Sequence, residues 1–235
     1  RGCPRECYFC SVKLIWGRTW RARSAKNVVD EIELMKSKGY REFYFMDDNS
    51  SVSKERMHEI CDLILKRKLK IKIATPTGIA INTLDKELLR KMKKAGFYRI
   101  CFGIETANPE SQKIIKKRVD LKQANRIIKE ANGLGFWTSG TFIIGFPHET
   151  LKDIYKTLDF VLASNMDFPV FHLLNPQPKT EVYDIMKKEG LITVDSELDL
   201  AYGNGFKTHL FSNKDLHRIV AEVYRKFLIR KTFCI

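Results

Sequence analysis

Long hydrophobic runs are missing from the sequence, which has 235 residues. No window approaches the roughly 18 consecutive apolar residues that a membrane-spanning helix needs. A leader with a basic start, an apolar middle and small residues at its end is also absent. We therefore expect a protein without a membrane span, located in the cytoplasm. Because the chain opens with Arg1 and reaches a cysteine cluster at once, we also expect it to begin inside a longer protein.

Cysteine is scarce, with six residues in the whole sequence. That is too few for a fold held together by disulfides, and an intracellular chain keeps its thiols reduced. Three of the six crowd into eight residues, at Cys3, Cys7 and Cys10. Cys61 lies on an expected helix stripe and Cys101 in an expected strand, where a buried cysteine usually acts as a small hydrophobic residue. The uneven distribution indicates a metal centre near the start of the chain.

Acidic residues are outnumbered, since 28 Asp and Glu stand against 42 Lys and Arg and the formal charge is +14. Such a balance suits nucleic acid or acidic substrates. The basic residues, however, are spread over expected helix faces, as at Lys86, Arg90 and Lys94, and form no long tail. We favour a solvated surface and keep nucleic acid as an alternative partner. The hydrophobic fraction of 44% is close to that of ordinary globular proteins and predicts a packed core.

Short apolar segments alternate along the chain with segments of helical periodicity. The apolar segments, interpreted as strands, lie at about 43–46, 71–74, 99–104, 141–144 and 170–174. Strict alternation predicts right-handed crossovers and a parallel sheet with helices outside. With one more strand ending near Arg1, the fold class is α/β, a partial (β/α)6 TIM-like barrel whose first strand is truncated. We expect this core to span residues 1–176, and a C-terminal extension with a terminal helix packed on the core to span 177–235.

Polar residues follow the expected strands, at the edge where ligand groups gather in parallel α/β sheets and barrels. Each also has a plain structural interpretation, because Asp and Asn open turns and a capping box such as Thr150 with Asp153 simply begins a helix. The groups are the three cysteines, Asp47 to Asn49, Thr75 to Thr77, Glu105, Gly145 to Pro147, and Asn175. One edge of the sheet therefore carries every candidate.

The cysteines are separated by three and two residues, and Gly2 and Pro4 supply bends that let a short chain wrap three thiolates around one centre. A structural zinc site normally completes its tetrahedron with a fourth Cys or His, and the neighbouring sequence offers none. Three ligands on a four-iron cube leave one iron without a protein ligand and open to reaction. A zinc knuckle or an accidental cluster remains the alternative.

Cys-x3-Cys-x2-Cys, with Phe9 before the last cysteine, resembles the signature of the radical S-adenosylmethionine (SAM) enzymes. The resemblance implies a [4Fe-4S] cluster on Cys3, Cys7 and Cys10, with SAM chelating the open iron. An electron from the cluster then cleaves SAM reductively to methionine and a 5′-deoxyadenosyl radical, which abstracts hydrogen from a small-molecule substrate. The resemblance also implies a separate reducing electron donor, and no side chain is assigned as catalytic.

The same resemblance implies contacts to SAM, which we extend to Phe9, Thr75 and Asn175. Asp48 and Asn49 would bind the methionine amino group, although the superfamily often has Gly-Gly-Glu at these positions. Glu105 would contact the ribose or the methionine portion. Lys117 would neutralise the methionine carboxylate, or is a solvated charge in a basic run. The segment along the adenine would contribute Phe142, Gly145 and Pro147, with His148 where relatives usually have glycine.

Further stretches resemble radical enzymes that carry a cobalamin-binding domain ahead of the core. These stretches are residues 1–4, 16–18, 21–24, 45–49, 102–106, 145–150 and 224–228. That branch implies methylation of unactivated carbon or phosphorus, or ring formation, with cobalamin held by a domain outside this chain. Two alternatives stay open. One is a radical methylthiotransferase acting on tRNA or protein, and the other is a non-catalytic iron-sulfur or zinc module that only binds a partner.

Overall fold

The computed structural model describes residues 1–193 and 204–233, and its centre is one sheet of five parallel strands. Neighbouring strands in the sheet are also consecutive in sequence, so β1 and β5 are its two edges and the sheet is an open, partial barrel. The expected α/β class is confirmed, and the five strands match the five that the sequence predicts. They are β1 (Glu42–Tyr44), β2 (Lys72–Ile79), β3 (Phe97–Glu105), β4 (Trp137–Ile144) and β5 (Phe168–Leu173).

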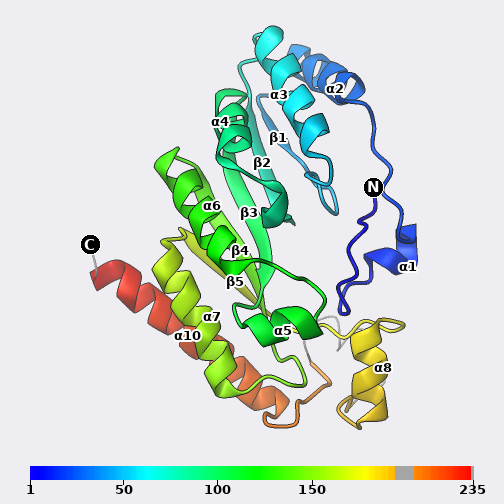
Figure 1. Ribbon diagram of the computed structural model, residues 1–235, viewed down its shortest axis with the longest axis vertical. Coiled ribbons are helices and arrows are strands. Elements are labelled where there is room, and N and C mark those ends of the chain that lie inside the picture. The colour runs from blue at the N-terminus through cyan, green and yellow to red at the C-terminus, as the bar shows by residue number, and fades with distance from the viewer. Residues whose placement is uncertain (194–203, 234–235) are drawn as a thin grey trace.

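Helices connect consecutive strands and cover the outer face of the sheet, while the N-terminal segment lies across its open side (Figure 1). The longer helices of this layer are α2 (Ala25–Ser37), α3 (Lys54–Lys66), α4 (Lys86–Lys94), α6 (Leu121–Gly133) and α7 (Leu151–Ser164). Shorter helices lie near the carboxyl ends of the strands: α1 (Val12–Trp16), η1 (Ile81–Thr83) and α5 (Pro109–Ile114). None of the helices in the described ranges is both long and apolar enough to cross a membrane.

Local sequence signals set where the helices begin. Thr150 and Asp153 form a capping box at the start of α7, as the sequence predicts. Asn108 accepts a hydrogen bond from the Glu110 N–H, and Pro109 occupies the first turn of α5, where its missing N–H costs nothing. These helices begin in the connections that follow β3 and β4, so both helix N-termini lie near the edge that holds the candidate residues.

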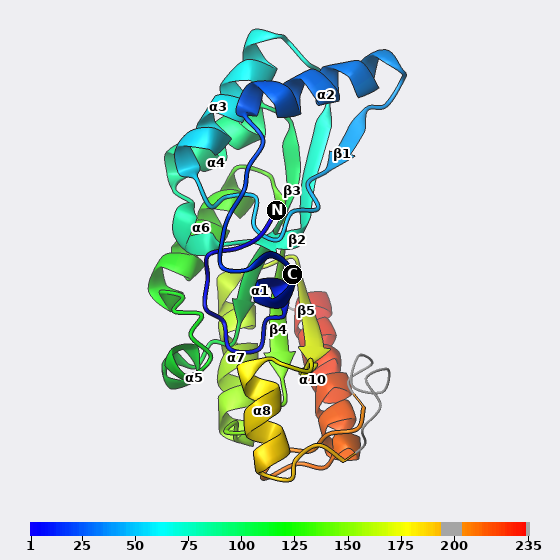
Figure 2. The same ribbon diagram turned by 90° about the vertical axis from the view of Figure 1, so that its right-hand side faces the viewer.

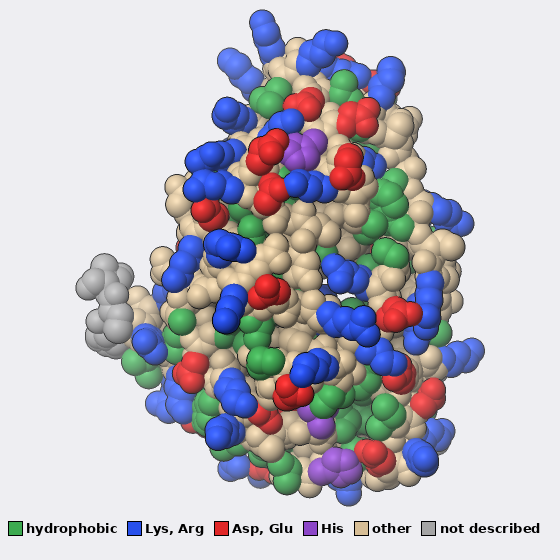
Figure 3. All heavy atoms as spheres, viewed as in Figure 1, with side chains coloured by type: hydrophobic (Ala, Val, Ile, Leu, Met, Phe, Trp, Pro, Cys, Tyr) green, Lys and Arg blue, Asp and Glu red, His purple; other side chains and the backbone are tan. Residues whose placement is uncertain are grey.

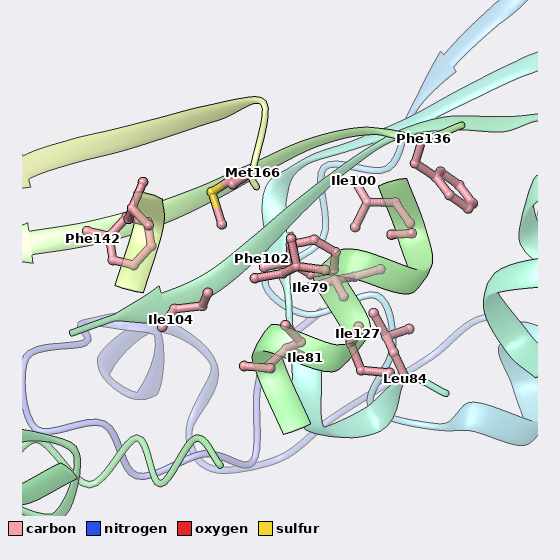
Figure 4. Packing of buried hydrophobic residues seen from close by; sticks show 14 of the residues in the cluster. Ile79, Ile81, Leu84, Ile100, Phe102, Ile104, Ile127, Phe136, Phe142 and Met166 are labelled. Carbon is pink, nitrogen blue, oxygen red and sulfur yellow. The ribbon is translucent and has the colours of Figure 1, made fainter. Parts of the chain in front are cut away.

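The hydrophobic core lies between the sheet and its outer helices. Ile100, Phe102 and Ile104 alternate along β3, are inaccessible to solvent and point toward this layer, where Ile127 of α6 also packs (Figure 4). Burying one such side chain fully contributes about 1.5–3 kcal/mol. The intervening residues of β3 therefore point to the open side of the sheet, and Glu105 at the strand end is one of them.

Beyond residue 176 the chain adds α8 (Glu181–Lys188) and α10 (Asn213–Phe233). In α10, Tyr224 accepts a hydrogen bond from the Phe171 N–H of β5 at 2.8 Å, and the helix runs beside β5 and α7 (Figure 2). The Val182 N–H of α8 donates to the carbonyl of Tyr8 at 3.2 Å. The C-terminal part of the chain thus touches both the edge of the sheet and the cysteine segment. Lysine and arginine side chains are scattered over the face shown in Figure 3, with carboxylates between them.

Candidate functional site

A cavity of about 330 Å³ opens at the carboxyl ends of β2, β3 and β4. One wall is the cysteine loop, which we define as residues 2–11. The opposite wall comes from the ends of the strands and the connections that follow them. The cavity brings together eight of the predicted site residues: Cys3, Cys7, Phe9, Cys10, Asp48, Asn49, Glu105 and Lys117. Segments separated by more than 100 residues along the sequence therefore meet in one place.

Backbone hydrogen bonds fix the cysteine loop against the sheet. The Gly2 N–H donates to Oδ2 of Asp48 at 2.7 Å, and the Tyr8 N–H donates to the carbonyl of Ile115 at 3.1 Å. Gly2 has a φ of 84°, and a Cβ there would lie 2.2 Å from the carbonyl oxygen of Thr19. Only glycine fits this position. Asp48 therefore holds the loop that carries the thiols, a contact that the sequence did not predict.

The three thiols are free of disulfides and face the cavity. Burial raises the pKa of the Cys7 thiol to about 11, against the lowering effect of Lys117, and nearby Cys10, Glu105 and Cys3 raise it further. Burial also raises the pKa of Cys10. The Cys7 thiol is consequently protonated near neutral pH, and a bound metal must displace its proton.

The chemistry of these donors fits an iron-sulfur cluster. Thiolates are the soft ligands that iron-sulfur clusters use, and neither a histidine nor a fourth cysteine is among the described residues that line the cavity. In residues 1–193 and 204–233, no three His, Cys, Asp or Glu side chains are arranged so that they could hold a metal ion as they stand. The thiols thus share a cavity without forming a closed ligand set, and binding of a cluster would draw them together.

A nearly buried ion pair faces the cysteines across the cavity. Lys117 Nζ lies 3.0 Å from Glu105 Oε1, and the two side chains are 19% and 10% exposed. Thr141 of β4 donates a further hydrogen bond to the Glu105 carboxylate, with oxygen separations of 3.3 and 3.4 Å. Burial works against the charge of Lys117, but the nearby carboxylate of Glu105 raises its pKa overall. The lysine therefore stays protonated, and the pair offers one charge of each sign to a ligand.

The backbone is strained on both sides of this pair. Glu105 has a φ of 70°, and the pairing of β3 with β4 shifts register between Gly103 and Glu105. Lys116 and Arg118, which flank Lys117, have φ values of 57° and 55°. Non-glycine residues adopt such angles at a cost of roughly 1–3 kcal/mol each, and they cluster at functional sites. The strained positions therefore coincide with, or directly flank, two side chains that line the cavity.

The remaining five predicted contacts, Thr75, Phe142, Gly145, Pro147 and Asn175, do not line the cavity. Thr75 was expected after its strand, and that placement is wrong because β2 continues to Ile79. Phe142 is fully buried on the helix side of β4 (Figure 4). Their contacts with SAM therefore stay predictions, without support from the shape of the cavity.

Gly145 belongs to a turn that packs against the cysteine loop. Its N–H and that of Phe146 donate to Oε2 of Glu149 at 3.0 and 3.1 Å. The ring of Phe146 lies 5.8 Å from those of Tyr8 and Phe9. Burial raises the pKa of Glu149 to about 8, although the two backbone hydrogen bonds lower it. Glu149 therefore stabilises the turn that precedes it by accepting both backbone hydrogen bonds.

Neither of the two histidines near this edge, His148 and His172, lines the cavity. His148 Nε2 lies 3.0 Å from the hydroxyl of Ser111, and burial lowers the pKa of its ring. His172 pairs with Ile143 in the sheet and is exposed outside the cavity.

Sequence reasoning missed other residues that line the cavity, chiefly Arg5, Lys13, Met46, Gly103 and Thr141. Gly103 and Thr141 are register partners on neighbouring strands. Side chains alternate along a strand, so a strand that places Glu105 in the cavity also places position 103 there. This alternation is the signal by which Gly103 could have been predicted. Arg5 and Lys13 lie in and beside the cysteine motif, so their proximity in sequence was the available clue.

Comparison with known proteins adds a family and several relatives. A family model described as the Radical SAM superfamily matches residues 1–161. An uncharacterized methyltransferase of Pyrococcus horikoshii is 28% identical over 98% of this chain and 50% of its own length. Cytidylyl-2-hydroxyethylphosphonate methyltransferase of Streptomyces wedmorensis is 28% identical over 98% of the chain and 45% of its own length. The anaerobic magnesium-protoporphyrin IX monomethyl ester cyclase of Rubrivivax gelatinosus is 28% identical over 99% of this chain and 42% of its own length. The chain thus spans half or less of the length of these relatives.

Two solved structures have the same fold. The radical SAM methyltransferase TsrM from Kitasatospora setae, with cobalamin and a [4Fe-4S] cluster bound, superposes with a TM-score of 0.74 and 17% identity, covering 90% of this chain and 43% of that one. The cobalamin-dependent radical enzyme OxsB, with aqua-cobalamin and SAM bound, superposes with a TM-score of 0.71 and 19% identity. The match covers 89% of this chain and 38% of that one. At these identities the likeness concerns the fold alone.

Proposed function

Because this chain belongs to the radical SAM superfamily, we propose that it is the core of an enzyme that cleaves SAM reductively and abstracts hydrogen from a small-molecule substrate. The observation that carries the proposal is one cavity lined by three free thiols and a buried pair of opposite charges. A [4Fe-4S] cluster would supply the electron that breaks a carbon–sulfur bond of SAM to give the 5′-deoxyadenosyl radical. The residues of this chain bind, orient and shield the reactants.

Cys3, Cys7 and Cys10 would hold the iron. Each must lose a proton to do so, and the ammonium of Lys117 favours the thiolate form of Cys7. The amide of Asn49 approaches the sulfur of Cys3 at 4.0 Å and also accepts from the Ser51 N–H, so its orientation is fixed from within the chain. Hydrogen bonds to cluster sulfurs tune reduction potentials, which gives Asn49 a role beside the ligands.

Lys117 and Glu105 would orient SAM. The methionine end of SAM carries an ammonium and a carboxylate, and the pair presents one partner for each. Thr141 holds the Glu105 carboxylate from the neighbouring strand, so the acceptor is in position before the ligand arrives. Glu105 can also accept a hydrogen bond from a ribose hydroxyl.

Apolar residues would shield the reactive species. Phe9, Ile79 and Ile81 are among the side chains that line the cavity, and both isoleucines are about 1% exposed to solvent. Water excluded from this space cannot quench a reactive intermediate, and electrostatic interactions are stronger there. The shielding favours radical chemistry over a site that only stores a metal.

We assign the reaction to the methyltransferase and cyclase type of the relatives. Cobalamin would be bound by a domain outside this chain and would supply the methyl group in a methylation. We further propose a separate reducing electron donor and a cytoplasmic location. The methylthiotransferase alternative rests on a relative of Methanocaldococcus jannaschii named for that activity, with 26% identity over 83% of the chain.

The test is anaerobic reconstitution of the full-length protein with iron and sulfide. We expect broad iron-sulfur absorption, about four irons per chain, and release of 5′-deoxyadenosine when dithionite and SAM are added. A colourless zinc protein that leaves SAM intact would contradict the proposal and support the binding-module alternative.

A further inference from the structure

A buried amide joins the two chain segments that carry the ion pair of the cavity. Glu105 and Lys117 are 12 residues apart in sequence, and Gln112 lies between them in α5, the short helix that follows β3 (Figure 1). Gln112 is 3% exposed and makes three side-chain hydrogen bonds, two through Nε2 and one through Oε1. A buried amide whose donors and acceptor are all engaged makes the backbone around it rigid.

The Nε2 group of Gln112 binds the turn at which Glu105 stands. It donates to the carbonyl of Ile104 at 2.7 Å and to that of Thr106 at 2.5 Å. The Thr106 N–H also donates to the Ile104 carbonyl at 3.0 Å, across Glu105 with its φ of 70°. A hydrogen bond of this span around a positive φ is typical of a rare and strained form of γ-turn. The amide bridges both carbonyls of this turn and therefore opposes its relaxation.

The rest of Gln112 binds the segment that carries Lys117. Its Oε1 accepts from the Val119 N–H at 3.0 Å, and its backbone carbonyl accepts from the Arg118 N–H at 3.3 Å. Arg118 is one of the strained positions, with a φ of 55°, and its own carbonyl accepts from the amide of Asn82 at 2.9 Å. One residue is thus bonded to the strained backbone on both sides of the ion pair.

We propose that Gln112 is the positioning residue of the Lys117–Glu105 pair. It fixes the two segments that carry the pair, so that the ammonium and the carboxylate are in place before the methionine end of SAM binds. Ordering long side chains during binding costs affinity, and a site that is ordered beforehand avoids that cost. The inference rests on the proposed function and adds a residue that acts through two others. Gln112 itself does not line the cavity.

Gln112→Met distinguishes positioning from packing. Methionine is close to glutamine in length and volume, but it has no hydrogen to donate and its sulfur is a weak acceptor. If Gln112 only fills space in the core, the variant should behave like the wild type toward every ligand. If Gln112 positions the pair, the variant should lose affinity for ligands that use the pair and for no others.

The experiment uses the full-length reconstituted protein and two probes, SAM and 5′-methylthioadenosine. Both contain adenosine with sulfur at its 5′ carbon, but methylthioadenosine lacks the amino and carboxylate groups of methionine. For Gln112→Met, we expect about tenfold weaker binding of SAM by calorimetry, the size of effect that a displaced hydrogen bond to a charged group produces. Binding of methylthioadenosine and the iron content should stay unchanged.

Asn132→Leu is the matched control. The Asn132 amide also bridges distant segments, because it donates to the Asn165 carbonyl at 2.6 Å and accepts from the Thr138 hydroxyl at 2.7 Å. None of these three residues lines the cavity. The control should therefore melt at a lower temperature and bind both probes as the wild type does.

Hydrogen–deuterium exchange of the ligand-free protein separates this inference from the proposed function. The amides of Thr106 and Val119 should exchange faster in Gln112→Met than in the wild type, and at the wild-type rate in Asn132→Leu. If the wild type neither binds nor cleaves SAM, the proposed function fails, while the exchange rates still decide whether Gln112 fixes the two segments.

Gln112→Glu gives a second test if Gln112→Met does not fold. It keeps an oxygen for the Val119 N–H and has at most one hydrogen to donate, so only Thr106 should exchange faster. SAM should again bind more weakly and methylthioadenosine equally well. Unchanged exchange at both amides, unchanged SAM affinity, or an equal loss of affinity for both probes would overturn the inference.

Discussion

Gly103 and Lys117 approach each other so closely that a side chain at position 103 would crowd the end of the lysine. A Cβ built at Gly103 would lie 3.0 Å from Lys117 Nζ and 3.2 Å from Glu105 Oε1. Both atoms belong to the ion pair that faces the thiols. The absence of a side chain at one strand position thus allows two charged groups from separate elements to meet in the cavity.

Gly103→Ala should separate this pair. The added methyl group is closer to Nζ than most real Cβ contacts, so the flexible end of the lysine must move. We expect SAM affinity to fall about tenfold, as measured by calorimetry, while the iron content stays unchanged. Gly133→Ala is the control, because nothing lies within 4 Å of a Cβ there. Equal affinities of both variants would show that the pair tolerates the displacement.

Glu105→Gln tests the charge of the pair while keeping its shape. The amide cannot neutralise the ammonium of Lys117, which is only 19% exposed. We expect weaker SAM binding, again by about tenfold, with full cluster loading. Affinity that matches the wild type would return Glu105 to a purely structural role.

Cys7→Ala should abolish cluster assembly and leave the fold largely intact, because the cysteine loop lies at the edge of the sheet outside the main core. Iron analysis and thermal unfolding of the reconstituted proteins measure the two effects. Cys61→Ala provides the opposite pattern, since Cys61 is fully buried in α3. It should keep its iron and lose about 1 kcal/mol of stability. A Cys7→Ala protein that still cleaves SAM would contradict the ligand assignment.

Glu149 gives a pH dependence whose sign follows from burial. Its pKa in the folded protein is about 8, against an ordinary value of 4.5, so between these pH values the folded state holds a proton that the unfolded state has released. Its contribution to stability is complete below about pH 4.5 and is lost as the pH rises through 8. Glu149→Gln cannot ionise and removes this contribution.

Melting temperatures at pH 5.5 and 8.5 measure the effect. The wild type should lose more stability between the two values than Glu149→Gln does. The same pH dependence in both proteins would mean that the carboxyl group titrates alike in the folded and unfolded chain.

The strands were predictable because a strand covered by helices must be apolar, and such apolar runs are visible in the sequence. The end of β2 was not, because Pro76 and Gly78 are typical strand breakers, yet the strand continues past both with a shift in register. The direction of side chains on β4 was also beyond the sequence. Thr141 faces the cavity and Phe142 the helices, and alternation alone does not say which side is which.

The site was predictable where one motif carried it and unpredictable where distant strands supplied it. The motif predicted that Cys3, Cys7 and Cys10 lie around one centre, and all three line the cavity. The contact of Asp48 with Gly2 depends on how the loop folds back over the sheet, which no local pattern encodes.

Because the cysteine loop is bonded to three distant parts of the chain, its state can be read far from the metal. Asp48 after β1, Ile115 after α5 and Val182 in α8 each share a hydrogen bond with the loop. When iron is lost, these three bonds should open more often together. The amide of Val182 would then exchange with deuterium faster, making this position in α8 a reporter of iron occupancy.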